Sequence, residues 1–172
     1  MAGKSKTMAK KTIVAASHSR RVHIAKAYER DYQGWLAAQV RAIRDGRLGD
    51  IDSSNLAEEL EDMGRSAKKA LKSQLVRLMA HLLKWSVQKD IRQRNPSAAN
   101  RWLASIRNAR MEIKDDLAES PSLKTYLPTI FAKANSAAIN GAVEDTGLAD
   151  TAFPPQCPWS LDDVLRDNFL PD

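Results

Sequence analysis

Apolar side chains recur every three or four residues along most of this chain, and this spacing limits its fold more than any other feature. Such a period places apolar residues on one face of an α-helix, whereas a β-strand alternates them with polar ones. The sequence contains no alternating segment and no long-period repeat. Five main helices and a short C-terminal helix are predicted, over residues 27–45, 54–63, 66–90, 97–118, 123–143 and 161–167. We therefore expect an all-α protein, a single bundle in which successive helices pack antiparallel.

Glycine and proline predict where some of these helices end. Gly64 is expected to stop the second helix and to separate it from the third. Pro128, in the second turn of the fifth helix, is expected to bend that helix or to shift its start. The second helix carries an apolar stripe formed by Leu56, Leu60 and Met63.

The net charge of +6 hides a strong segregation along the sequence. Residues 1–26 hold 7 basic and no acidic side chains (+7), 27–64 hold 4 and 9 (−5), 65–114 hold 13 and 2 (+11), and 115–172 hold 3 and 10 (−7). For the first segment we expect a flexible basic arm, a targeting segment or a start-site artefact, followed by one helical domain over 27–172. In that domain the acidic flanks either neutralise the basic centre or leave it open to a polyanion.

The cysteine count and the lack of long apolar runs exclude several classes of protein. Cys157 is the single cysteine, which rules out an internal disulfide and a zinc site built from cysteines alone. No neighbouring basic residue lowers its pKa in the local sequence, so we expect a structural thiol. No apolar run approaches 18 residues. We therefore expect no contact with a membrane and a cytoplasmic location.

Few residues in the sequence suit catalysis or metal binding. Two of the three histidines lie near the N-terminus, and the chain has no Glu-x-x-His pair, which a di-iron bundle requires. We therefore predict no metal and no cofactor, and we identify no small-molecule substrate. His81 is the one histidine in the helical part. If the second and third predicted helices packed antiparallel, Glu59 would reach it, either as part of a general base or as a buried polar pair that fixes packing.

Six short motifs follow one another along the helical part. They are Tyr28-x-x-Asp31-Tyr32-x-x-Trp35, Asn55-Leu56-Ala57-Glu58-Glu59-Leu60-Glu61-Asp62-Met63-Gly64-Arg65-Ser66, His81-Leu82-Leu83-Lys84-Trp85, Ser105-Ile106-Arg107, Ser120-Pro121-Ser122-Leu123 and Phe153-Pro154-x-x-Cys157-Pro158-Trp159. In order and spacing they resemble the bacterial family called domain of unknown function 29, over about residues 27–165. The resemblance implies an all-α domain of a bacterial protein. It supplies no activity, cofactor or catalytic residue.

These observations favour a binding protein over an enzyme. The first hypothesis is a non-enzymatic module that binds a protein partner or self-associates, because its charge is segregated. The second is non-specific nucleic-acid binding through the arm and the basic helices of 65–114. The third is an unrecognised hydrolase that uses His81 and Glu59. The residues expected to bind nucleic acid or a partner are Lys68, Lys69, Lys72, Arg77, Lys84, Arg92, Arg94, Arg101 and Arg107.

Overall fold

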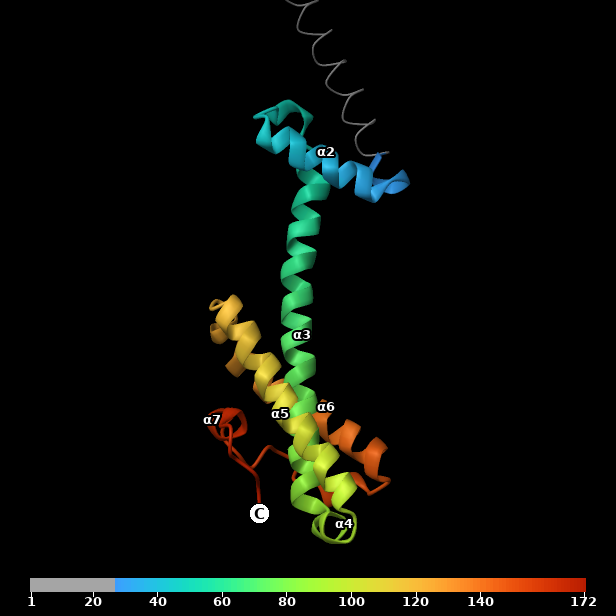
Figure 1. The fold of residues 1–172 in the computed structure, drawn as a ribbon, viewed down its shortest axis with the longest axis vertical. Coiled ribbons are helices and arrows are strands. Elements are labelled where there is room, and N and C mark those ends of the chain that lie inside the picture. Colours follow the sequence, from blue (N-terminus) through green and yellow to red (C-terminus); the bar gives the residue numbers. More distant parts are fainter. Residues whose placement is uncertain (1–26) are drawn as a thin grey trace, which may run out of the picture. The chain divides into compact units, whose positions relative to one another are not determined.

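The computed structural model of the chain describes residues 27–172, which are helical with no strand among them (Figure 1). Within this part, the helices of seven or more residues are α2 (Tyr32–Arg44), α3 (Ser53–Val87), α5 (Pro96–Glu119) and α6 (Leu123–Thr146). The shorter elements are η1 (Leu48–Asp50), α4 (Lys89–Arg94), η2 (Asp150–Ala152) and α7 (Leu161–Leu165). The predicted all-α class is confirmed. The arm predicted for residues 1–26 lies outside the described residues.

The predicted stop at Gly64 is wrong, because α3 runs through this residue without interruption (Figure 1). Gly64 keeps an ordinary helical backbone, since the glycines with positive φ in the described part are Gly46 and Gly147. A glycine inside a helix costs only about 1 kcal/mol relative to alanine. Strong helix formers, chiefly Ala, Leu, Glu and Lys, lie on both sides of it. The second and third predicted helices are therefore one helix of 35 residues.

The first predicted helix is divided at Asp31. Residues 27–30 are helical, Asp31 is not, and α2 begins at the next residue. The Asp31 carboxylate accepts the backbone N–H of Gly34 at 2.9 Å and so caps α2. A Cβ on Gly34 would lie 2.2 Å from that carboxylate, so this cap depends on the glycine. Outside these two places, the predicted helix ends lie within three residues of the observed ones.

The chain divides after Gly64 into two compact units, and α3 contributes residues to both. The second unit, residues 65–172, is a packed bundle of α3, α5 and α6 (Figure 1). The large side chains of its core are fully or almost fully buried, and they include Leu71, Leu75, Leu78, Leu82, Ile106, Ile113, Leu127 and Ile130. Small residues of α6 are also fully buried and let the neighbouring helices approach closely: Ala134, Ala138 and Ala142.

Two contacts give the direction of α6 in this bundle. Lys68 of α3 lies over the ring of Tyr126 at 5.4 Å, and Lys84 of α3 pairs with Asp145 at 2.5 Å. The contacted residues advance along both helices together, so α3 and α6 run in the same direction. Pro128 lies inside α6, and the start of that helix stays at Leu123, so the predicted shift of its start does not occur.

The segment after α6 is fastened to the bundle by a buried arginine. The guanidinium of Arg110 on α5 donates hydrogen bonds to the backbone carbonyls of Val164, Asp167 and Phe169, at 2.8, 2.9 and 2.7 Å. Burial lowers the pKa of this guanidinium, and the three carbonyls accept from three of its five N–H donors, one on each nitrogen. The C-terminal residues therefore belong to the second unit. No helix in the described part is long and apolar enough to cross a membrane.

Candidate protein-binding surface

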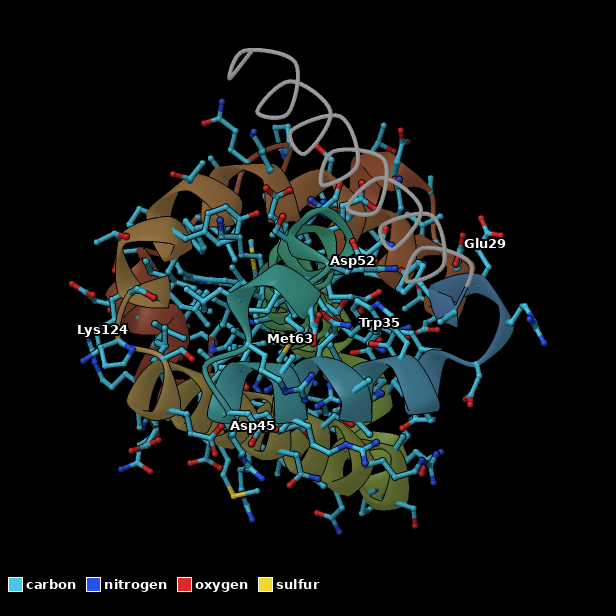
Figure 2. The ribbon with its side chains drawn as sticks, turned by 90° about the horizontal axis from the view of Figure 1, so that it is seen from above. Glu29, Trp35, Asp45, Asp52, Met63 and Lys124 are labelled. Atoms are coloured by element: carbon cyan, nitrogen blue, oxygen red, sulfur yellow. The ribbon has the colours of Figure 1, made fainter. Side chains whose placement is uncertain are left out.

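Residues 27–64 form the first unit, in which α2 is fastened to the start of α3 around Asp52. Trp35 of α2 is 2% exposed, and its indole Nε1 donates to the Asp52 carboxylate at 3.3 Å (Figure 2). The buried Gln39 accepts the backbone N–H of Asp52 at 2.7 Å through its Oε1. The same carboxylate accepts the side-chain amide of Asn55 at 2.8 Å. The Asp52 carboxylate also accepts the backbone N–H of Asn55 at 3.4 Å, so Asp52 both caps α3 and orients α2.

Glu59 anchors the N-terminal side of this unit. Its two carboxylate oxygens accept the hydroxyls of Tyr28 and Tyr32, at 2.5 and 2.7 Å. The hydrogen bond to Glu59 is the main reason that the pKa of Tyr28 is raised to about 12. The rings of Tyr28 and Trp35 meet edge to face, with centroids 4.8 Å apart. The carboxylate of Glu59 is thus occupied in holding the aromatic side chains that cover Trp35.

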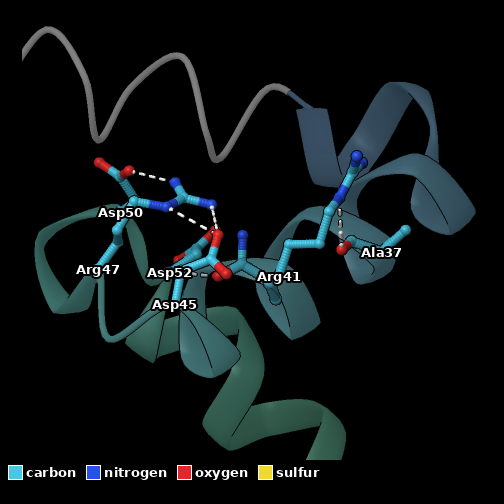
Figure 3. A network of polar contacts seen from close by, with 7 residues as sticks. Ala37, Arg41, Asp45, Arg47, Asp50 and Asp52 are labelled. Atoms are coloured by element: carbon cyan, nitrogen blue, oxygen red, sulfur yellow. Dashed lines mark hydrogen bonds and ion pairs between the residues drawn. The ribbon is translucent and has the colours of Figure 1, made fainter.

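Ion pairs close the turn between α2 and α3. The guanidinium of Arg47 binds the carboxylates of Asp45 and Asp50, at 3.1 and 2.6 Å (Figure 3). Gly46 takes a left-handed backbone conformation, with φ of 68°, which suits the residue after a helix end. Arg41 donates to the carbonyl of Ala37 at 3.3 Å. These contacts give the turn a defined shape at the surface of the unit.

The first unit buries little and exposes much apolar surface. Only Trp35, Gln39 and Ala42 are buried among residues 27–64. The large apolar side chains that stay exposed in this unit are Tyr32, Val40, Ile43, Leu48, Leu60 and Met63. Leu48, Met63 and Leu60 are 75%, 68% and 61% exposed. Leu60 and Met63, two of the three residues in the predicted apolar stripe, are thus largely exposed in the described part.

The first unit contains a shallow pocket of about 590 Å³. Small residues of α2 line it, with Gly34, Ala38 and Ala42 four residues apart along one side of the helix. Asp31 and Arg41 add charge to its lining. The pocket and the exposed apolar side chains both lie on the unit that carries the acidic excess of −5. The first unit thus offers a surface of mixed apolar and acidic character.

Comparison with protein families identifies the chain. The family model described as Domain of unknown function DUF29 matches residues 27–170. The chain belongs to this family. The match confirms the resemblance seen in the six motifs and spans both units. A search of the curated proteins and a search of the solved structures found no match. The DUF29 family has no assigned function.

The two residues of the hydrolase hypothesis have separate surroundings in this DUF29 chain. Their pairing required two antiparallel helices, but Glu59 and His81 lie on the one continuous α3. Glu59 accepts from two tyrosines, as described above. His81 is half-buried in the second unit, and its Nδ1 is a buried atom without a hydrogen-bond partner in the described part. Burial, followed by the charge of Lys84, lowers the pKa of His81 to about 4. Its imidazole is therefore neutral at pH 7.

The nine basic residues predicted for binding differ widely in their surroundings. Lys84 is 4% exposed, so its ammonium does not lie at the surface. Five of the nine interact within the chain: Arg77 with Glu112, Lys84 with Asp145, Arg94 with Asp90, Arg92 over Trp85 and Lys68 over Tyr126. Lys69, Lys72, Arg101 and Arg107 have exposed side chains. The positive charge of residues 65–114 is thus partly neutralised inside the second unit.

The side chains of Cys157 and Asn135 contribute to packing in this DUF29 chain. The thiol of Cys157 is half-buried and donates to the carbonyl of Trp159 at 3.4 Å, and burial raises its pKa. A thiol with a raised pKa is a poor nucleophile at neutral pH. Asn135 donates to the carbonyl of Pro155 at 3.0 Å. Within residues 27–172, no three His, Cys, Asp or Glu side chains gather as metal ligands would.

Proposed function

We propose that this chain is a non-catalytic protein-binding module and that residues 27–64 carry its docking surface. One observation carries the proposal. Nine large apolar side chains are exposed in the described part, and six of them lie in these 38 residues, whereas residues 65–172 hold three. Exposed apolar side chains that gather on one part of a protein mark sites of interaction.

The charge of the first unit indicates the character of the partner. The unit that carries the exposed apolar side chains also carries an acidic excess of −5, so a basic partner surface with apolar side chains of its own would complement it. The burial of apolar side chains supplies affinity, and opposite charge speeds association and selects the partner. This combination supports protein binding over nucleic-acid binding, since the excess negative charge of this unit repels phosphates.

Site-specific photo-crosslinking in the cells that produce the protein tests the proposal. Leu60 is replaced by photoreactive benzoylphenylalanine, and Met111 of α5, which is 56% exposed, serves as the matched control position. We expect protein adducts from position 60 and none above background from position 111. The absence of adducts from position 60, or equal adducts from both positions, would contradict the proposal.

The nature of the adduct also tests the competing hypothesis. Nucleic-acid adducts at Lys69 or Arg107, with none to protein at Leu60, would favour the nucleic-acid function. In that case, the slope of log affinity against log salt concentration would give the number of phosphates that the protein contacts.

A further inference from the structure

We infer that the second unit holds a binding pocket for a small aliphatic carboxylate, between α5 and the residues that follow α7. The pocket has a volume of about 440 Å³, which lies in the range typical of small-ligand sites. Its lining comes from α5 and from Asp167 and Asn168. The pocket lies wholly within residues 65–172, so this inference stands apart from the docking surface proposed for the first unit.

The observation that carries the inference is a buried guanidinium with donors to spare. Arg110 lines the pocket and is 2% exposed. Each of its three nitrogens donates to one backbone carbonyl, and the two terminal nitrogens each carry one further N–H. No residue in the described part accepts from these two N–H groups. Buried donors without an acceptor cost free energy, and an acceptor bound in the pocket would remove that cost.

The positive charge of Arg110 also has no carboxylate bound to it. Its three acceptors are neutral carbonyls, and burial lowers the pKa of the guanidinium because the surroundings disfavour the charged form. Asp167 acts on this pKa in the opposite direction, but its carboxylate is paired with the ammonium of Lys114. A buried charge is stabilised when an opposite charge binds beside it. The pocket therefore favours an anion.

A second arginine lines the same pocket. Arg107 precedes Arg110 by three residues, so both lie on one side of α5. The side chain of Arg107 is exposed, and it makes no hydrogen bond or ion pair within residues 27–172. A guanidinium binds a carboxylate through two parallel N–H groups. In the proposed complex, Arg107 binds the anion from the solvent side, and Arg110 binds it from the buried side.

The charge and the apolar part of the lining indicate which anion fits. Three basic and two acidic side chains give the lining a net charge of +1: Arg107, Arg110, Lys114, Asp115 and Asp167. One carboxylate neutralises this charge, whereas a phosphate dianion leaves an excess negative charge beside two aspartates. Met111 also lines the pocket and is 56% exposed. It follows Arg107 by about 6 Å along the helix, a distance that a short aliphatic chain spans.

The experiment is a titration of the full chain with hexanoate at constant ionic strength, followed by the backbone amide signals in NMR spectra. Hexanoate has one carboxylate and a short aliphatic chain, and hexanamide has the same chain without the charge. We expect saturable shifts at residues 107–115 and 167–168 with hexanoate and none with hexanamide. Inorganic phosphate should bind at least about tenfold more weakly than hexanoate, because of the two aspartates.

A pair of arginine variants locates the site. Arg107→Gln removes the exposed guanidinium and leaves Arg110 to hold the C-terminal residues. We expect it to raise the dissociation constant of hexanoate about tenfold. Arg101→Gln makes the same change at another exposed arginine of α5, which does not line the pocket, and it should leave the dissociation constant unchanged.

Each outcome supports or overturns the inference. Saturable binding of hexanoate that Arg107→Gln weakens and Arg101→Gln does not weaken supports it. No saturation with hexanoate, equal binding of hexanamide, or no difference between the two variants overturns it. Binding of phosphate that is tighter than that of hexanoate also overturns it, since the inferred ligand is a carboxylate. Crosslinking at position 60 tests the first unit alone, so the proposed function and this inference can fail separately.

Discussion

His81 shows how one side chain makes stability depend on pH. Its pKa is about 4 in the folded chain and 6.5 ordinarily, chiefly because burial disfavours the imidazolium and next because Lys84 repels it. Between these two pH values the unfolded chain binds a proton that the folded chain does not. The free energy of unfolding therefore falls as the pH falls through this window. Allowing for the partial exposure of the ring, we expect a loss of about 1 kcal/mol between pH 7 and pH 5.

Urea unfolding of the wild type and of His81→Leu at both pH values measures this loss. The leucine fills a similar volume, and the Nδ1 that it removes has no hydrogen-bond partner in the described part. We expect the variant to lose about 1 kcal/mol less than the wild type between pH 7 and pH 5. An equal loss in both proteins would show that His81 titrates normally in the fold.

At the scale of the element, Gly64 lowers the stability of α3. Gly64→Ala fits the helix without a contact, so we expect the chain to gain about 0.5–1 kcal/mol in thermal or urea unfolding. Gly141→Ala in α6 is the matched variant, since a Cβ there also meets no atom within 4 Å, and we expect a similar gain from it. A loss of stability in Gly64→Ala beside a gain in Gly141→Ala would contradict this prediction.

The same element shows what the sequence can and cannot predict. The three-and-four spacing determined the helical class and most helix ends, because burial in the second unit follows that period. The helix end predicted at Gly64 is wrong, because the free-energy cost of one glycine in a helix is small compared with the helix propensity of the residues around it. The spacing also placed Leu60 on an apolar stripe, but such a stripe has the same period whether its side chains are buried or exposed, and Leu60 is exposed. The pairing expected for Glu59 and His81 depended on that misplaced stop.

At the scale of the whole molecule, the two units bury very different amounts of apolar surface. The cluster of buried core residues lies entirely in residues 65–172, while three residues are buried in 27–64. α2 has 13 residues, a length at which an isolated helix is marginal in water. Its stability therefore depends on a few contacts, chiefly those of Trp35 with Asp52 and of the tyrosines with Glu59. We expect α2 to open locally while the bundle stays folded.

Amide hydrogen exchange measures this difference. At low protein concentration, we expect residues 36–44 of α2 to exchange at least about 100-fold faster than residues 75–83 of α3, which lie in the core of the bundle. Trp35→Phe removes the indole donor to Asp52 and should speed exchange in α2 without changing the bundle. Equal protection of α2 and the bundle core would show that the two units unfold together.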